Sequence, residues 1–207
     1  MAGAAAEPPP WQAAPLSAAP GCPFFPRAGY CTVPLASGSV LYVLGGQHGG
    51  KLLNDVWALQ LTAGAAWEWV EASPNQDPKG TVAAGETVVS SKWAGRERFS
   101  AAAVGISRGR RAMYVCGGLG KQNYLEDFWA SEDSGKSWYC MCQQLPFGGR
   151  VDAGLLAVPG RYEQLVLCCG MSKGDGGMQM NADIWLSCDA GSSWQELARP
   201  GPEMEPR

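Results

Sequence analysis

Short apolar runs separated by glycines and polar turns dominate the pattern of this chain. Three of the runs are almost continuously hydrophobic and end in small residues: Leu41-Tyr-Val-Leu-Gly-Gly46, Met113-Tyr-Val-Cys-Gly-Gly118 and Leu165-Val-Leu-Cys-Cys-Gly170. A continuous apolar run of this length between turn residues predicts a strand that is covered on both faces. Helical periodicity is not evident anywhere, so we expect an all-β protein.

The three runs recur in a nearly constant register with arginine and tryptophan, which indicates a repeat. An arginine precedes each small-residue exit by 18 or 19 positions, and two tryptophans follow that exit. The repeat residues are Arg27, Gly45, Gly46, Trp57 and Trp67 in the first unit, Arg98, Gly117, Gly118, Trp129 and Trp138 in the second, and Arg150, Gly170, Trp185 and Trp194 in the third.

A twelve-residue pattern, D-x-W-x-S-x-D-x-G-x-S-W, occurs at residues 127–138 and again at 183–194. We predict a hairpin for each copy, in which Asp133 or Asp189 bonds to the turn backbone and Gly135 or Gly191 adopts a positive φ. Both aspartates are therefore interpreted as structural. The first unit is a degraded copy, because Thr62 stands at the aspartate position.

Each unit predicts four short strands. The expected ranges are 28–35, 40–45, 53–60 and 66–71, then 98–106, 111–117, 124–131 and 136–142, and then 152–158, 163–169, 181–187 and 193–198. Four-stranded sheets that repeat about every 50 residues are typical of the blades of a β-propeller. The blades should span approximately residues 27–71, 96–142 and 150–198.

These residues carry a family resemblance. The run Phe25-Pro-Arg-Ala-Gly, the Val-Leu-Gly-Gly46 exit, the Leu53-Asn-Asp-Val-Trp57 strand and the closing tryptophan resemble kelch repeats of the galactose oxidase type. The repeated hairpins resemble the Asp-box of sialidase-type propellers. The resemblance covers residues 25–207 and implies a partial β-propeller of about three four-stranded blades. It identifies a fold more strongly than a function.

Three blades leave a ring open, because closed propellers have typically 4–8 blades. We therefore expect a fragment of a larger propeller with remnants of flanking blades, such as Trp11, or a protomer that self-associates through its open blade edges. The Ala/Pro-rich segment 1–24 is predicted to be poorly ordered, and residues 72–80 belong to a long connection between the first two blades.

Charge and composition exclude some partners. A formal net charge of −3 gives no field that would attract nucleic acid, and no apolar run reaches the 18 or more residues of a membrane span. The N-terminus lacks the basic start and apolar core of a secretory signal, so we expect a cytoplasmic protein. We interpret the eight cysteines as buried free thiols in a reducing compartment, with an inter-blade disulfide as the alternative.

No constellation of residues predicts an enzyme, a metal site or a cofactor. The chain has one histidine and no C-x-x-C pair, and Gly117-Gly-Leu-Gly-Lys121 lacks the spacing of a phosphate-binding loop. Radical-copper chemistry needs more histidines than this chain supplies. Sialidase chemistry needs an arginine cluster, a tyrosine nucleophile and acid/base carboxylates, whereas the recurring arginines and aspartates here fit structural positions.

The sequence thus predicts a non-catalytic protein-binding scaffold. The loops after the small-residue exits, at residues 47–51, 119–123 and 171–180, vary while the strands repeat, which is expected of a rigid frame with an adaptable face. The candidate contact residues are His48, Lys51, Lys121, Gln122, Tyr124 and Lys173. The alternative is a carbohydrate-active or carbohydrate-binding propeller whose catalytic groups lie in missing blades.

Overall fold

The computed structural model describes residues 21–34, 40–61, 67–76, 92–105, 111–158, 163–174 and 176–198. Trp11, Thr62, Arg207 and most of the predicted 1–24 segment lie outside these residues, as does part of the long connection before the second blade. Over the described residues the secondary structure consists of strands and turns, with no helix. The all-β prediction is confirmed.

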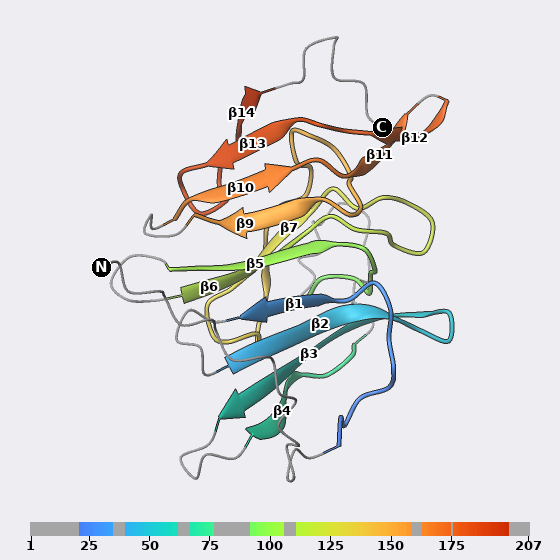
Figure 1. Ribbon diagram of the computed structural model, residues 1–207, viewed down its shortest axis with the longest axis vertical. Helices are drawn as coiled ribbons and strands as arrows, with labels where there is room; N and C mark the ends of the chain where they lie inside the picture. The colour runs from blue at the N-terminus through green and yellow to red at the C-terminus, as the bar shows by residue number, and fades with distance from the viewer. Residues whose placement is uncertain are drawn as a thin grey trace, which may run out of the picture.

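The described strands form three four-stranded antiparallel sheets, each built from strands in chain order, and one two-stranded hairpin. Figure 1 shows the three sheets following one another along the long axis of the molecule, as expected for part of a propeller. Blade 1 contains β1 (Cys31–Pro34), β2 (Val40–His48), β3 (Lys51–Leu61) and β4 (Trp67–Ser73). Blade 2 contains β5 (Ser100–Gly105), β6 (Arg111–Cys116), β7 (Phe128–Ser131) and β8 (Tyr139–Cys142). Blade 3 contains β9 (Gly154–Ala157), β10 (Leu165–Cys168), β13 (Ile184–Ser187) and β14 (Gln195–Ala198).

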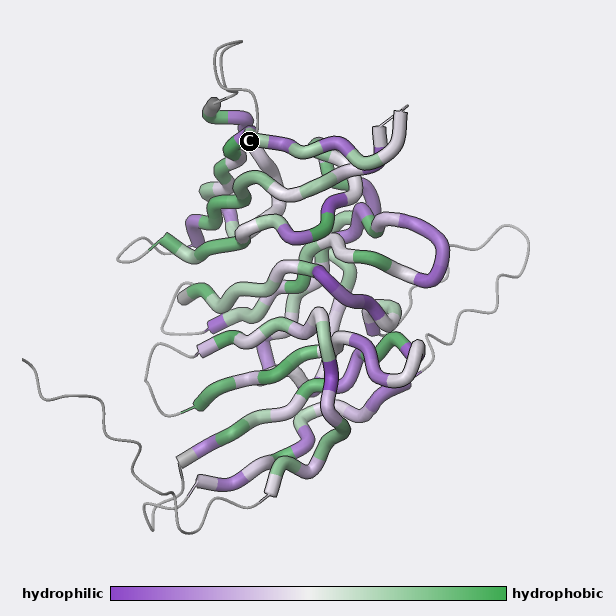
Figure 2. Tube along the Cα trace, turned by 45° about the vertical axis from the view of Figure 1, so that its right-hand side comes forward, coloured by the Kyte–Doolittle hydropathy of each residue, from purple (hydrophilic) through white to green (hydrophobic). Residues whose placement is uncertain are grey.

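Two apolar layers hold the blades together face to face. One layer joins blades 1 and 2 and includes Leu44, Val56 and Val115; the other joins blades 2 and 3 and includes Phe128 and Leu167. All five side chains are buried. In Figure 2 the centres of the strands are coloured as hydrophobic, while several loops at the strand ends are hydrophilic. The first strands of successive blades are in contact, β1 with β5 and β5 with β9.

Two segments that we predicted as loops are hairpins. Strands β2 and β3 continue past a β-bulge at the glycine pair and pair as far as His48 with Lys51, so residues 47–51 form a tight turn. Residues 171–180 form β11 (Met171–Gly174) and β12 (Gly177–Met180). The sequence pattern missed both, because glycine-rich strands lack the apolar alternation by which a strand is recognised.

The closing tryptophan of blade 1 is Trp69 rather than the predicted Trp67. Trp69 lies opposite Leu59, which stands two positions after Trp57. In blade 2 Ala130 lies opposite Tyr139, so in the same register Trp138 corresponds to Ser131, which stands two positions after Trp129. Trp69 also makes the edge-to-face contact with an aromatic ring of the preceding linker, at a centroid distance of 5.0 Å from Phe24. Trp138 and Trp194 make the same edge-to-face contact, with Trp93 and Phe147. The sequence W-x-W at 67–69 made the choice ambiguous.

The repeated Asp turns are held largely by their own residues. The Asp133 carboxylate accepts hydrogen bonds from the backbone N–H groups of Lys136 and Ser137, and from the Ser137 hydroxyl. Asp189 accepts the same two types of bond from Ser193. In each turn the glycine N–H donates to the first serine, Ser131 or Ser187.

The glycines of these turns also touch the preceding blade. A Cβ added to Gly135 would lie 2.9 Å from Val56 of blade 1, and one added to Gly191 would lie 2.1 Å from the Phe128 ring of blade 2. Val56 and Phe128 occupy the middle position of the D-x-W sequence in their own blades. Each Asp turn therefore also joins two blades.

The outer face of blade 3 carries exposed apolar side chains. Leu156 and Leu197 of blade 3 are 58% and 53% exposed. Ile184 occupies the position of Val56 in blade 1 and Phe128 in blade 2, each of which contacts the turn glycine of the next blade. Self-association through the open faces of the outer blades stays a prediction. Over the described residues, no helix has the length and hydrophobicity that crossing a membrane would require.

All eight cysteines carry free thiols. Burial raises the pKa of Cys31 to about 12, and its Sγ donates to the Phe99 carbonyl, 2.8 Å away, at the junction of blades 1 and 2. Cys22, Cys169 and Cys188 are exposed, contrary to our interpretation of the cysteines as buried residues.

Candidate functional site

The variable segments project from one end of the sheets, which we call the glycine end. In Figure 1 the hairpin β2–β3, the loop between β6 and β7, and the hairpin β11–β12 all project from the right-hand side. The opposite end, which we call the turn end, carries the Asp turns between β7 and β8 and between β13 and β14. Because antiparallel strands alternate in direction, the entry of the first strand and the exit of the second meet at the glycine end of every blade.

A buried arginine–aspartate pair, which we call a clamp, closes the glycine end of each blade. The arginine of the linker before the first strand binds an aspartate through two Nη–Oδ contacts of 2.5–2.9 Å. This aspartate directly precedes the third strand in blades 2 and 3 and lies within β3 in blade 1. The same arginine donates to the carbonyl at the exit of the second strand, and the aspartate accepts from the indole N–H two residues later. The clamps are Arg27–Asp55–Trp57, Arg96–Asp127–Trp129 and Arg150–Asp183–Trp185.

Burial makes these clamps electrostatically strong. The arginine side chains of the three clamps are only 0–5% exposed. Burial by itself raises the pKa of Asp127 and Asp183, but the hydrogen bonds and charge of Arg96 and Arg150 outweigh it, so both pKa values lie below 3.8. Bidentate pairing satisfies both carboxylate oxygens, which is what permits a charge to be buried here.

The arginine of blade 2 in this position is Arg96, not the predicted Arg98. Arg98 lies two residues later, where blade 1 has Gly29 and blade 3 has Asp152, and all three residues have φ between 54° and 62°. The Arg98 N–H donates to the Gly29 carbonyl, and the Asp152 N–H donates to the Arg98 carbonyl. The Arg98 side chain forms a solvent-exposed ion pair with Asp152, which links blades 2 and 3.

A groove of about 670 Å³ between blades 2 and 3 contains several of the candidate contact residues. One wall is the β6–β7 loop with Gln122, Asn123 and Tyr124, and the opposite wall is the β11–β12 hairpin with Lys173 and Met178. The linker Phe147-Gly-Gly149 forms the floor. Candidate contact residues of blades 2 and 3 thus lie around one groove, which the repeat pattern alone could not show.

A second groove, of about 570 Å³, lies between blades 1 and 2. Lys51 and Lys121 line it, together with the Gly49–Gly50 turn and Glu97. Leu119 borders both grooves, so the two form neighbouring hollows along the glycine end.

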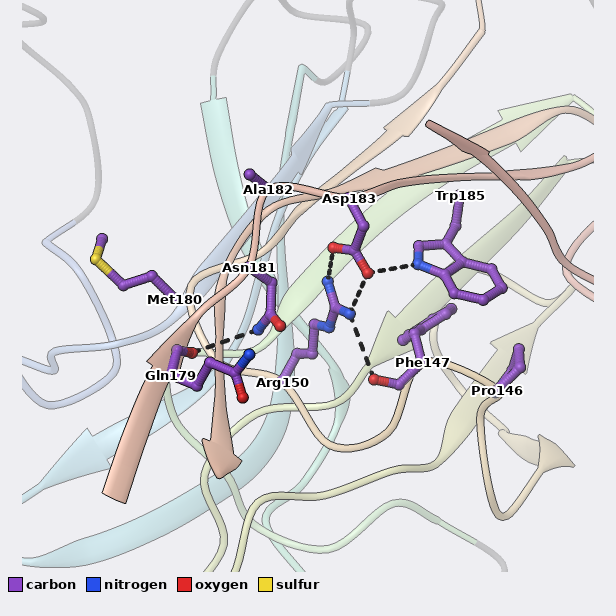
Figure 3. A pocket seen from close by; sticks show the side chains of 9 residues that line it. All are labelled: Pro146, Phe147, Arg150, Gln179, Met180, Asn181, Ala182, Asp183 and Trp185. Atoms are coloured by element: carbon purple, nitrogen blue, oxygen red, sulfur yellow. Dashed lines mark hydrogen bonds and ion pairs between the residues drawn. The ribbon is translucent and has the colours of Figure 1, made fainter. Parts of the chain in front are cut away.

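The third hollow surrounds the clamp of blade 3 and is shown in Figure 3. It measures about 470 Å³ and contains the Arg150–Asp183 pair with the Trp185 indole bonded to the same carboxylate. The Asn181 side chain turns toward Arg150 in Figure 3. Arg150 and Asp183 bond to each other through both carboxylate oxygens, while the buried Arg150 Nε has no hydrogen-bond partner among the described residues.

His48 lies in none of these three hollows. Its Nδ1 is 2.7 Å from the Pro26 carbonyl, and its ring stacks on Phe25 at a centroid distance of 5.0 Å. The histidine therefore holds the N-terminal linker against the β2–β3 hairpin.

Lys92 is a buried cation that the sequence did not single out. Its ammonium group bonds to the Ser73 hydroxyl and to the Pro74 carbonyl, which ties the end of β4 to the linker before blade 2. Burial lowers the pKa of Lys92 to about 8, although the charges of Asp55 and Glu71 oppose the shift.

Within the described residues, histidine, cysteine, aspartate and glutamate side chains do not gather into any group of three that could hold a metal ion. The clamps were also missed from the sequence, although a pattern was present. An aromatic residue stands three positions before each clamp arginine, as Phe24, Trp93 and Phe147, and D-x-W follows in all three blades. That joint pattern selects Arg96 over Arg98.

Comparisons with known proteins support the kelch resemblance. A family model for the Kelch motif matches residues 28–76, which covers blade 1. Among the solved structures that match is "Structure of YjhT", a kelch-type propeller, with a TM-score of 0.55 and 16% sequence identity. The match covers 86% of this chain and 47% of that one, so this chain spans about half the length of the solved structure. No curated protein matches the sequence. At this identity the likeness shows the fold, and the kelch-type propeller prediction is confirmed.

Proposed function

We propose that this chain is a non-catalytic binding module that holds a segment of a partner protein in the groove between blades 2 and 3. The observation that carries the proposal is the joint placement of Gln122, Tyr124 and Lys173 around one hollow of about 670 Å³. That volume falls within the range of roughly 300–1,000 Å³ that is usual for ligand sites.

The chemistry of the groove suits a polypeptide. Side-chain amides from Gln122 and Asn123 and the Ser172 hydroxyl offer both donors and acceptors to peptide groups, and the ring of Tyr124 offers apolar surface. The walls are anchored to packed blades, so little ordering entropy is lost on binding.

The same lining argues against catalysis. Among the described residues, the lining holds one carboxylate, Glu126, and no histidine or cysteine. Hydrolysis of glycosides uses a pair of carboxyl groups about 5–10 Å apart, and the described lining does not supply such a pair. The carbohydrate-acting alternative would therefore depend on residues beyond the described blades.

Selection of phage-displayed peptides on the immobilised chain tests the proposal. Enriched peptides should lose at least about tenfold in affinity, measured by fluorescence polarisation, for Gln122→Ala and Tyr124→Ala, because central aromatic contacts commonly contribute more than 1 kcal/mol. His48→Ala, outside the groove, is the matched control. Urea midpoints equal to the parent would show that the variants are folded.

Two results would overturn the proposal. Peptides that bind all three variants as tightly as the parent would place the binding surface elsewhere. A chain that enriches no peptide but binds defined sugars on a glycan array would favour the carbohydrate alternative.

A further inference from the structure

The hairpin β11–β12 extends further beyond the glycine end than the equivalent β2–β3 hairpin of blade 1, and it lines the groove. In blade 3 the chain leaves β10 and makes this hairpin before β13, whereas in blade 2 the chain crosses from β6 to β7 through a loop. An element that differs between the blades on a binding face is a natural place for specificity.

Methionines gather on one face of this hairpin. Met171 lies opposite Met180, and Lys173 lies opposite Met178. Residues directly opposite in an antiparallel pair share a face. Because both backbone groups of Met171 bond to Val151, its pair with Met180 is not hydrogen-bonded, and side chains in such pairs approach more closely.

These methionines are not part of the core. Met178 is 69% exposed and Met180 is 56% exposed, whereas Met113 between blades 1 and 2 is 2% exposed. Met178 lines the groove, whereas Met180 lines the hollow around the blade 3 clamp. An exposed thioether such as that of Met178 adapts to apolar side chains of different shape.

The hairpin is held in place through its other face. The Asn181 N–H donates to the Gly170 carbonyl at 2.8 Å, and its side-chain amide donates to the Ser172 hydroxyl at 3.0 Å. Figure 3 shows Gln179 and Asn181 turned toward Arg150, while the Met180 side chain extends to the other side. These hydrogen bonds of Asn181 therefore fix the orientation of the hairpin and of its methionine face.

Lys173 gives this wall a positive charge. It is exposed, and over the described part of the chain it forms no ion pair. The carboxylate that lines the groove, Glu126, comes from the blade 2 side. An acidic residue of a bound segment would therefore be attracted to the hairpin wall and repelled from the opposite one.

We propose that the partner segment carries a bulky aliphatic or aromatic residue that packs on Met178, next to an aspartate or glutamate that pairs with Lys173. This inference rests on the proposed function and specifies the chemistry of the partner. The apolar anchor and the acid must both face the hairpin wall that carries Met178 and Lys173.

A charge swap tests the pairing. Peptides enriched on the parent chain should share an apolar residue with an acid beside it. Lys173→Glu should weaken the best peptide at least about tenfold, and replacing the peptide's acid by lysine should restore most of that loss for the variant alone. Lys136→Glu, which changes the charge equally at the turn end, is the control and should change the affinity less than about threefold.

A methionine pair of variants tests the anchor. Met178→Leu keeps apolar bulk and should leave the affinity within about threefold, whereas Met178→Gln should lose at least about tenfold. Three results with groove-dependent peptides would overturn this inference: no preference for an acid, no rescue in the charge swap, or equal losses for the two Met178 variants. Each would leave the proposed function standing. If no peptide binds, both fall.

Discussion

The two ends of blades 2 and 3 use an aspartate in different ways. At the glycine end, Asp127 bonds to Arg96, 31 residues away in the sequence, and shares a buried position with it. At the turn end, Asp133 bonds within four residues of itself and stays exposed to water. The same side chain therefore fixes a chain crossing in one place and shapes a local turn in the other.

This difference determines what each end can contribute. The clamps stabilise the sites where linker, second strand and third strand meet, so the loops that form the grooves start from fixed points. The Asp turns contact the preceding blade through their glycines. The glycine end is therefore suited to carry variable binding loops, and the turn end to hold the stack of blades together.

The largest expected effect is loss of a clamp. Asp127→Ala leaves the Arg96 side chain buried without its counter-charge, and we expect the free energy of unfolding to fall by about 3–5 kcal/mol in urea denaturation. Asp152→Ala, which removes the exposed partner of Arg98, should cost less than about 1 kcal/mol. Equal costs for the two variants would mean that burial does not distinguish the clamp.

An intermediate effect is expected for a turn glycine. Gly191→Ala should cost about 2–4 kcal/mol, because φ is +92° and the new Cβ would lie 2.1 Å from the Phe128 ring. Gly49→Ala has a positive φ but nothing within 4 Å of its Cβ, so it should cost about 1 kcal/mol. If thermal denaturation gives the two variants the same loss, the turn end does not couple the blades.

The smallest effect is expected for the turn aspartate. Asp133→Asn should cost about 1 kcal/mol at pH 7, because hydrogen bonds to an exposed carboxylate are weakened by water. Burial raises the pKa of Asp133, but the hydrogen bonds from Ser137, Ser131 and Lys136 together lower it below its ordinary value. The contribution is complete above the pKa of the unfolded chain and is lost as the pH falls through the lower folded value.

The difference in unfolding free energy between parent and Asp133→Asn should therefore shrink below about pH 4. Urea titrations at pH 7 and at pH 3 measure that change. A gap that stays constant over this range would show that the turn does not depend on the charge of Asp133.

The sequence predicted most of the strands, because period and turn chemistry are local properties. The expected ranges of all twelve blade strands overlap the observed ones, and the turn pattern at 127–138 and 183–194 located both Asp turns. The errors at Arg98 and Trp67 were each a shift of two residues. Trp67 and Trp69 lie on the same face of β4, so alternation could not distinguish them. Arg96 and Arg98 lie in the linker before β5, where strand alternation does not apply.

The candidate site was predicted in part. Gln122, Tyr124 and Lys173 meet at one groove, Lys51 and Lys121 meet at another, and His48 stays outside both. The methionine face of β11–β12 was missed, because a glycine-rich hairpin has no strand pattern and its exposure is set by the blade that stands beside it.

The sequence by itself determined the repeat, the strand order within each blade and the local turns, since these depend on residues close together along the chain. The tertiary structure decided which arginine faces which aspartate, which tryptophan closes blade 1 and which loops share a groove. Those choices depend on how blades stack, because the energy of a buried ion pair or of a ring contact arises only when distant segments come together and exclude water.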